Sequence, residues 1–341
     1  VHCGEVTMVE VVSEPILRVN RLHTQFSTDK GVIPAVNGID FSLYKGEIVG
    51  LVGESGCGKS VTSLSVLKLI PQPPGKISAD KMEFKSEDLI HATERRMRQL
   101  RGNDISMIFQ DPMSSLNPTF TIGHQISEVI RIHKKASRKE ALRQSVEMLS
   151  KVGIPRAERT VKDYPHQLSG GMRQRVMIAM AMACQPELLI ADEPTTALDV
   201  TIQAQILNLM KQLNQEQGTA ILLITHDLGV VAEVCERVLV MYAGKVVEEG
   251  DVRSILKDPQ HPYTQGLIAS VPKRKERSQR LYSIPGTVPK PGSLKRGCAF
   301  APRCTFAFDS CWKEAPELYP LGNGRRSRCL LHREEGSQRI E

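Results

Sequence analysis

Three short apolar runs along the chain predict strands that are buried on both faces. They cover residues 47–52, 188–191 and 220–224, and neither of the last two contains a charged residue. Strands in the middle of a parallel sheet have this composition, because helices cover both faces of such a sheet. Between the last two runs, apolar residues recur at helical spacing, at Ile202, Ile206, Leu209, Met210 and Leu213. This spacing predicts a helix with one face on the core, and the whole pattern predicts an α/β fold with a parallel sheet.

The chain has 341 residues, of which 40% are hydrophobic, and this is enough for one substantial core and a smaller appended unit. No stretch approaches the roughly 18 consecutive apolar residues that a membrane-spanning helix needs. The chain also does not open with a charged leader, an apolar stretch and a small-residue cleavage site. These features predict a protein that stays in the cytoplasm. Residues 1–7 precede Met8 and match no predicted element.

The net charge of +7 is concentrated near the C-terminus, where residues 271–341 hold 15 Lys and Arg against 7 Asp and Glu. A basic segment of this kind is one feature of proteins that bind nucleic acid or anionic lipid. No recognition helix and no interleaved aromatic residues accompany it. The charge pattern therefore does not favour a nucleic-acid partner.

The first apolar run leads into a glycine-rich loop with the pattern GxxxxGKS, and a helix follows. The loop and the next residue are Gly53, Glu54, Ser55, Gly56, Cys57, Gly58, Lys59, Ser60 and Val61. Glycines in this pattern let backbone N–H groups surround phosphate oxygens, and the helix N-terminus adds its positive dipole end. We expect Lys59 to reach the β- and γ-phosphates and the Ser60 hydroxyl to bind magnesium. The nine residues thus predict a site for ATP with Mg²⁺.

Polar residues follow the other two strands at the point where each strand ends. Asp192 and Glu193 come directly after the second run, and His226 follows the third run. Because the carboxyl ends of parallel strands meet at one edge of a sheet, these side chains are expected beside the phosphate loop. Asp192 would hold magnesium, Glu193 would be the general base for an attacking water, and His226 would sense the γ-phosphate. The sequence therefore predicts hydrolysis as well as binding.

A further motif, Leu168-Ser-Gly-Gly-Met-Arg-Gln-Arg175, precedes a helix rich in Met and Ala. Ser169, Gly170 and Gly171 at that helix N-terminus predict a second anion site. With this motif the sequence resembles the ABC ATPase family, although Met172 stands where glutamine is usual. The resemblance implies a P-loop NTPase of ABC type, with a RecA-like parallel sheet core, an antiparallel β edge and a helical subdomain.

The resemblance also assigns roles that the residues alone do not. Two ATPase subunits form a head-to-tail dimer in this family, so the Ser169 motif of one subunit closes over the ATP of the other. Gln110 matches the glutamine that contacts magnesium and the attacking water, and Asp199 in Ala197-Leu-Asp199 matches the loop at the dimer interface. Phe26 is the candidate to stack on adenine.

Other motifs resemble the ABC branch that imports oligopeptides, dipeptides and nickel. They are Ser114-Ser-Leu-Asn-Pro118, Ile122-Gly-His-Gln-Ile-Ser-Glu128, His261-Pro-Tyr-Thr264, Ile284-Pro-Gly-Thr-Val-Pro289 and Gly297-Cys-Ala-Phe-Ala-Pro-Arg-Cys304. This likeness implies two membrane-spanning permease subunits, a second related ATPase subunit, and an extracytoplasmic substrate-binding protein that acts indirectly. It places the protein peripherally at the cytoplasmic face of a bacterial inner membrane. Nickel or a metallophore remains an alternative cargo, and a soluble nucleic-acid ATPase and a redox-regulated binding module remain alternative classes.

Four of the eight cysteines gather near the C-terminus, at Cys298, Cys304, Cys311 and Cys329. In a reducing cytoplasm this grouping suggests a metal rather than disulfides, although the spacing lacks the CxxC pairs of structural zinc sites. Four thiolates suit either zinc or an iron-sulfur cluster. The likeness to dipeptide-importer ATPases favours a [4Fe-4S] cluster, with zinc and four free structural cysteines as alternatives.

These expectations divide the chain into two parts. Residues 8–270 form the ABC ATPase domain, and its helical subdomain covers about 111–170. Residues 271–341 form a small Cys-rich C-terminal extension.

Overall fold

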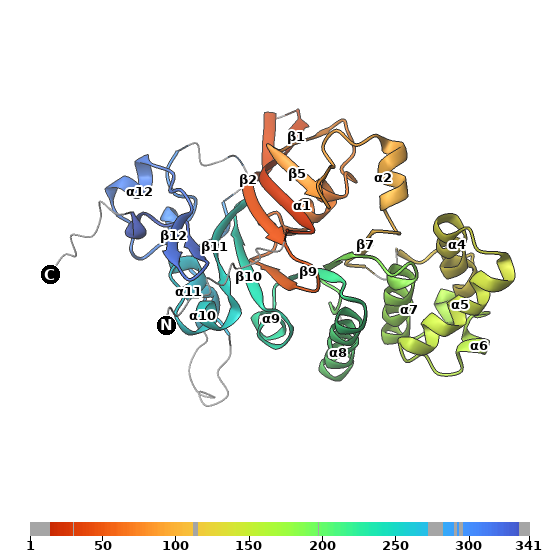
Figure 1. Ribbon diagram of the computed structural model, residues 1–341. Coiled ribbons are helices and arrows are strands. Elements are labelled where there is room, and N and C mark those ends of the chain that lie inside the picture. The colour runs from red at the N-terminus through yellow and green to blue at the C-terminus, as the bar shows by residue number, and fades with distance from the viewer. Residues whose placement is uncertain are drawn as a thin grey trace, which may run out of the picture.

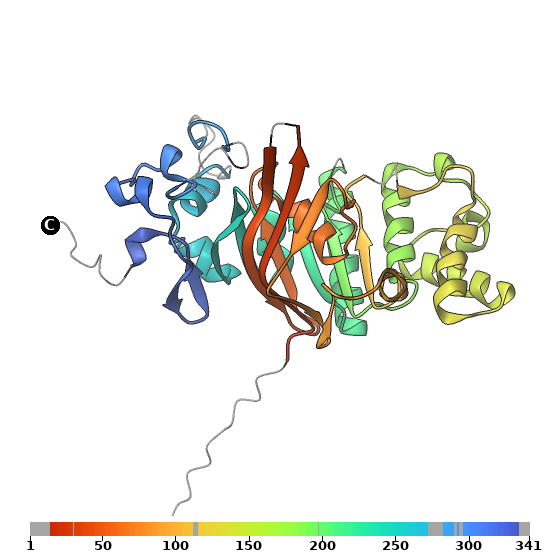
Figure 2. The ribbon, with the colours of Figure 1, turned by 90° about the horizontal axis from the view of Figure 1, so that it is seen from above.

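The computed structural model describes residues 14–29, 31–111, 115–196, 198–271, 282–289, 292 and 296–333. Residues 1–7 and Ala197 therefore lie outside the described residues, as do parts of the predicted extension. The described chain is elongated: helices α4 to α6 lie at one end and the short helix α12 lies at the other (Figures 1 and 2).

The central feature is a mixed sheet of eight strands. In spatial order the strands are β12 (Tyr319–Gly322), β13 (Arg325–Ser327), β11 (Lys245–Asp251), β10 (Arg237–Tyr242), β3 (Ile48–Val52), β9 (Ala220–Thr225), β8 (Leu188–Asp192) and β7 (Ile105–Ile108). The five strands from β10 to β7 run parallel, and β11 to β13 continue the sheet in antiparallel fashion. The three predicted strands are confirmed as β3, β8 and β9, side by side in the middle of the sheet.

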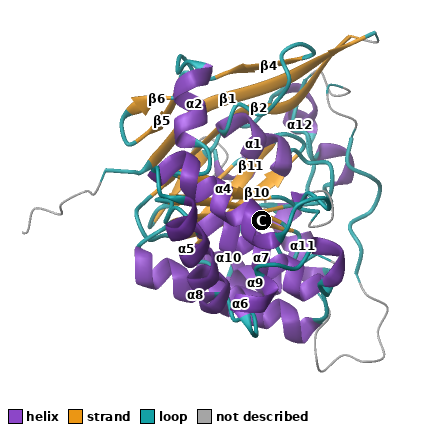
Figure 3. Ribbon diagram, turned by 90° about the vertical axis from the view of Figure 1, so that its right-hand side faces the viewer, coloured by secondary structure: helices purple, strands orange, loops and turns teal. Residues whose placement is uncertain are grey.

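A second, antiparallel sheet lies over one face of the first (Figure 3). Its strands are β2 (Gly31–Leu43), β1 (Leu17–Thr28), β5 (Lys81–Phe84) and β6 (Glu87–Asp88), with β4 (Gly75–Ser78) also paired to β1. The predicted antiparallel strands thus occur in two places, at an edge of the main sheet and in this second sheet.

Alternation of side chains between the two faces of β9 explains why residues 220–224 are all apolar. Leu222 and Ile224 belong to the core beneath the antiparallel sheet, whereas Ile221 and Leu223 belong to the core on the opposite face. Both faces are buried, so the positions from Ala220 to Ile224 are all apolar, and the strand ends at a buried threonine, Thr225. The helices around the sheet are α1 (Lys59–Val66), α2 (Glu94–Leu100), α8 (Val200–Gln217) and α9 (Leu228–Val234).

The helical lobe follows β7 in the chain. It contains α4 (Ile122–Lys134), α5 (Arg138–Lys151), α6 (Ala157–Thr160) and the turn η1 (Pro165–Gln167), and it leads into α7 (Gly170–Met182). Threonine and serine side chains begin the first two helices, because Thr121 and Ser137 accept the backbone N–H groups of His124 and Glu140. These helices fall within the predicted segment 111–170.

The C-terminal part is not a separate lobe. Its elements are α10 (Val252–Lys257), α11 (Pro262–Ala269), η2 (Ala301–Arg303), α12 (Asp309–Lys313) and η3 (Leu330–His332), in addition to β12 and β13. Phe300 and Tyr263 share one hydrophobic cluster with Val52 at the end of β3. The extension is therefore built onto the strand that leads into the phosphate loop.

Candidate functional site

The phosphate loop curls between β3 and α1, and two of its glycines are required by close contacts. Gly58 has φ +107°, and a Cβ there would lie 2.6 Å from the carbonyl oxygen of Ala35. A Cβ on Gly53 would lie 2.2 Å from the carbonyl oxygen of Met241. A Cβ on Gly56, in contrast, would meet no atom of the described residues within 4 Å. The neighbouring strands β2 and β10 therefore fix the two ends of the loop, and its tip is free.

Lys59 lies inside the loop rather than in solvent. Its Nζ donates to the carbonyl oxygens of Gly53 at 2.8 Å and Glu54 at 3.1 Å, and the residue is 6% exposed. Cys57 is also buried, and burial raises the pKa of its thiol. Its side chain therefore belongs to the core, whereas Ser55 and Gly56 are exposed. An ammonium group held by two carbonyl oxygens is placed to exchange them for phosphate oxygens.

Asp192 and Ser60 meet beside the loop, as predicted. Burial raises the pKa of Asp192, although a hydrogen bond from Ser60 lowers it. Asp192 is 4% exposed, and its Oδ1 has no hydrogen-bond partner among the described residues. A buried carboxylate oxygen without a partner is costly unless a cation accompanies it. The pair therefore fits a magnesium site.

Glu193 is the most heavily bonded side chain at this edge. Its Oε2 accepts hydrogen bonds from Gln110 Nε2 at 3.0 Å and Thr196 Oγ1 at 2.9 Å, and His226 Nδ1 lies 3.2 Å from its Oε1. Burial raises the pKa of Glu193, but the hydrogen bonds from Thr196 and His226 outweigh it, so the pKa is lowered. The residue also has φ +47°, an uncommon conformation outside glycine. These contacts fix an ionised carboxylate at the end of β8.

Of the three partners of Glu193, the sequence identified Gln110 and His226 but not Thr196. Glu193 and Thr196 lie in one turn, in which the Thr196 N–H donates to the Glu193 carbonyl oxygen at 3.2 Å. The signal available in the sequence was the Glu-Pro-Thr-Thr run, which places a hydroxyl three residues after the carboxylate.

The Ser169 motif lies at the start of α7, where its serine caps the helix. Ser169 Oγ accepts the N–H of Met172 at 3.4 Å. In the part of the chain that the structure describes, a Cβ on Gly170 would meet no atom within 4 Å, whereas a Cβ on Gly171 would lie 3.0 Å from a methyl carbon of Ile202. The motif lies on the side of the helical lobe, away from α1 under the antiparallel sheet (Figure 1). The structure thus keeps the two predicted anion sites of one chain apart.

Two other predicted residues have local structural roles in this structure. Asp199 caps α8, because its Oδ1 accepts the N–H of Ile202 at 3.0 Å. Phe26 lies half-buried in β1, opposite Gly75. Their nucleotide roles stay predictions.

The four C-terminal cysteines line one small cavity of about 20 Å³, together with His261 and Phe306. All four are free thiols. Burial raises the pKa of Cys298 and Cys304, and raises that of Cys329 to about 12. The described residues include no group of three or more His, Cys, Asp or Glu side chains arranged to hold a metal ion. The sequence therefore predicted the convergence of the thiols, but the structure shows no formed metal site among them.

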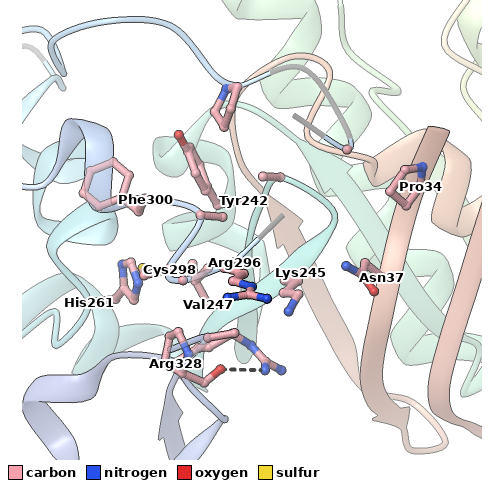
Figure 4. Close-up of a pocket in the computed structure, with 17 residues that line it drawn as sticks. Pro34, Asn37, Tyr242, Lys245, Val247, His261, Arg296, Cys298, Phe300 and Arg328 are labelled. Carbon is pink, nitrogen blue, oxygen red and sulfur yellow. Dashed lines mark hydrogen bonds between the residues drawn. The ribbon is translucent and has the colours of Figure 1, made fainter. Parts of the chain in front are cut away.

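A larger cavity of about 170 Å³ lies between the core and the extension (Figure 4). Its lining includes Cys298 and the cations Lys245, Arg296 and Arg328. Burial lowers the pKa of Lys245, and Arg328 lowers it further. Cys298 lines both cavities, so three basic side chains lie around the cavity next to the cysteines.

Two residues that the sequence analysis did not single out reach the phosphate loop from the C-terminal part. The Tyr263 hydroxyl accepts the Glu54 N–H at 2.9 Å. Arg303 donates two hydrogen bonds to the Glu54 carboxylate, at 2.7 and 3.0 Å. Both residues lie in motifs that were noted only for their likeness to a family.

Comparison with known proteins agrees with the family resemblance that the sequence motifs indicate. A family model described as ABC transporter matches residues 36–196, and another described as oligopeptide/dipeptide transporter, C-terminal region, matches residues 247–311. The oligopeptide transport ATP-binding protein AppD of Bacillus subtilis is 54% identical over 95% of this chain and 98% of its own length. The dipeptide transport ATP-binding protein DppD of Escherichia coli is 49% identical over 92% of this chain and 96% of its own length.

Among solved structures, the dimeric structure of the ABC transporter cassette MJ0796 has a TM-score of 0.62 and 27% sequence identity. The match covers 70% of this chain and 99% of the cassette. Within the described residues, no helix is both long enough and apolar enough to span a membrane. The predicted fold is confirmed, and so is the predicted family resemblance.

Proposed function

This chain belongs to the ABC transporter family as the ATP-hydrolysing subunit of a peptide importer, and we propose that Glu193 is the general base of its ATPase site. The observation that carries the assignment is the set of hydrogen bonds that fixes an ionised Glu193 carboxylate beside Asp192 and the phosphate loop. A base must be ionised and held within reach of its water. Glu193 meets both conditions.

The other residues of the edge take separate parts in the proposed mechanism. Lys59 binds the β- and γ-phosphates, and His226 donates to the γ-phosphate as charge develops on it. Ser60, Asp192 and Gln110 would hold Mg²⁺, which would supply charge neutralisation for the phosphate oxygens. Ser55, Gly56 and the other loop residues from Gly53 to Val61 cradle the phosphates through their backbone.

The proposed dimer supplies the rest of the site. Ser169, Gly170 and Gly171 of a second ATPase subunit would close over the γ-phosphate, with Asp199 at the interface and Phe26 against adenine. The open space at Gly170 supports this arrangement, because an anion approaches a helix N-terminus most closely where no side chain stands. ATP binding would then close the dimer, and hydrolysis would release it.

The experiment replaces Glu193 with glutamine in the assembled transporter. Glu193→Gln is expected to bind ATP normally and to lose hydrolysis by about 10²- to 10⁴-fold, the usual contribution of a general base. Glu216→Gln on the surface of α8 serves as the matched control and should hydrolyse ATP normally. Near-normal hydrolysis by Glu193→Gln would refute the assignment.

The membrane partners are proposed to dock beside Gln110. A largely apolar groove of about 270 Å³ lies there, lined by Leu69, Phe109 and Met180 among others, and Phe109 is 42% exposed. Such a groove fits a cytoplasmic helix of a permease subunit, which would hold this chain at the cytoplasmic face of the membrane. Phe109→Asp should abolish co-purification with the permease subunits, whereas Phe306→Asp in the extension should not.

We also propose that the four cysteines of the extension bind a [4Fe-4S] cluster. The convergence of four thiols on one cavity and the cations around Cys298 support it, because a cluster with four thiolates is anionic. Protein purified without oxygen should contain about four irons per chain, and Cys311→Ala should lose them while Cys184→Ala keeps them. Zinc in place of iron would support the alternative metal.

The proposed cargo is a peptide, because the relatives that the chain matches along nearly its whole length are named for oligopeptide and dipeptide transport. The division of the chain at residue 270 also remains a proposal. The match to the C-terminal family region begins earlier, at residue 247 in β11.

A further inference from the structure

Glu54, the second residue of the phosphate loop, is held from two places in the C-terminal part of the chain. Tyr263 in α11 accepts its backbone N–H, and Arg303 in η2 binds both oxygens of its carboxylate. These partners follow Glu54 in the sequence by 209 and 249 residues. A bidentate pair of this kind fixes orientation as well as distance.

Arg303 is itself held in place. Its side chain is 4% exposed, and its Nε donates to the carbonyl oxygen of Pro285 at 2.8 Å. The guanidinium carbon lies 5.8 Å from the centre of the Tyr242 ring and 6.0 Å from that of Phe300. Figure 4 shows these two rings side by side at the cavity. The guanidinium is thus a fixed anchor for the loop.

Glu54 also contacts Lys59. The Glu54 carbonyl oxygen accepts Lys59 Nζ at 3.1 Å and the N–H of Cys57 at 3.3 Å. A shift of Glu54 would therefore move the loop backbone and the lysine together. Arg303 therefore contacts Glu54 directly, and Glu54 contacts Lys59 directly.

We infer that Arg303 is a positioning residue for the phosphate loop, which it holds in the nucleotide-binding form through the Glu54 carboxylate. The inference rests on the proposed role of this loop in binding ATP. It also gives the extension a role in the ATPase site, because Arg303 directly precedes Cys304 of the cysteine cavity. Arg303 acts through another residue, so its loss should weaken ATP binding more than it slows the chemical step.

The experiment measures KM for ATP and kcat of the assembled transporter for Arg303→Met, Arg303→Lys and Glu54→Ala. Methionine keeps an apolar side chain against Tyr242 and Phe300 but removes the guanidinium N–H groups that bind the Glu54 carboxylate. We expect Arg303→Met and Glu54→Ala each to raise KM about tenfold with kcat changed less than about twofold, and the lysine variant to lie between wild type and methionine. The double variant should be no worse than either single one, because the two residues act as a pair.

Arg326→Met is the matched control. Arg326 also joins the extension to the core, through Glu249, but it lies away from the loop. Its loss should lower the melting temperature without changing KM. A Glu54→Ala protein with normal KM would overturn the inference, as would an Arg326→Met protein with the same rise in KM as Arg303→Met. Because Glu54 is 30% exposed, its variant should fold even if Arg303→Met does not.

Lys59→Ala separates this inference from the proposed function. Loss of ATP binding in Lys59→Ala with normal KM in Arg303→Met and Glu54→Ala would overturn the positioning role alone. Normal ATP binding by Lys59→Ala would overturn the assignment of the loop as the ATP site.

Discussion

His226 Nδ1 lies 3.2 Å from Glu193 Oε1, although 33 residues separate them in the sequence. The contact exists because β8 and β9 are neighbours in the parallel sheet, so the residues that follow them meet at one edge. His226 is largely exposed and Glu193 is largely buried. The pair thus joins a fixed carboxylate to a side chain that faces solvent, as a site that receives a substrate requires.

The first prediction concerns the pH dependence of hydrolysis. The proposed role of Glu193 as general base requires an ionised carboxylate, so we expect activity to fall as the pH falls through its pKa. The Thr196 hydroxyl is one of the groups that lower this pKa. In Thr196→Val the pKa of Glu193 should rise, and the acidic limb of the kcat profile should move to higher pH. Thr196→Ser keeps the hydroxyl and should retain the wild-type profile; identical profiles for the valine and serine variants would contradict this role.

Local sequence was enough to predict this edge of the sheet. The phosphate loop, Glu193 and His226 each follow a strand of the parallel sheet and Asp192 ends one, and a parallel sheet brings such positions together. The same reasoning could not predict the roles of Arg303 and Tyr263, because their contacts with Glu54 depend on how the C-terminal part folds back onto β3. No period or local spacing encodes a contact across 249 residues.

The antiparallel continuation of the main sheet was also not predictable in its details. Strand β12 is only four residues long and includes a proline and a glycine, and β13 is the polar run Arg-Arg-Ser, so both lack the apolar pattern of β8 or β9. Their pairing depends on buried carboxylates of β11, since Glu248 and Glu249 face Arg325 and Arg326. At this edge of the sheet, ion pairs between residues far apart in the sequence hold the strands together, and the sequence shows no hydrophobic pattern from which to predict them.

The second prediction compares two glycines of the phosphate loop. Gly58→Ala places a methyl group against the carbonyl oxygen of Ala35 at a position with φ +107°, whereas Gly56→Ala meets open space at φ +78°. Both substitutions carry backbone strain, but only the first adds a clash. Gly58→Ala should lower the free energy of unfolding by about 2 kcal/mol more than Gly56→Ala. Urea titration of the nucleotide-free proteins measures the difference, and equal losses would show that the clash is relieved.

The third prediction concerns the ion network at Arg237. This arginine donates to Glu47 at 2.9 Å and also binds Glu249, and the side chains of the two acids are 13% and 5% exposed. Arg237→Met leaves both carboxylates less well paired and should lower the free energy of unfolding by about 3 kcal/mol. Arg143→Met removes two exposed pairs on α5 and should have no measurable effect. Equal changes in the free energy of unfolding for Arg237→Met and Arg143→Met would mean that burial does not determine how much an ion pair contributes to stability.

The fourth prediction concerns acid stability and His261. This imidazole is fully buried, and burial lowers its pKa to about 3. Its Nδ1 accepts the N–H of Tyr263 at 3.0 Å and so begins α11 as a neutral group. Between pH 6.5 and 3 the unfolded chain binds a proton at this histidine that the folded chain does not, so stability must fall as the pH falls through this range.

One such group contributes about 2 kcal/mol of lost stability between pH 6.5 and pH 5. Asparagine also caps helices, so His261→Asn should keep the start of α11 while removing the titrating group. The difference in free energy of unfolding between pH 7 and pH 5 should therefore be smaller in His261→Asn than in wild type. His91→Gln, at an exposed position, should leave that difference unchanged. If His261→Asn retained the full wild-type dependence, a group other than the His261 imidazole would have to bind the proton, and the neutral cap of α11 would not be the acid-sensitive contact.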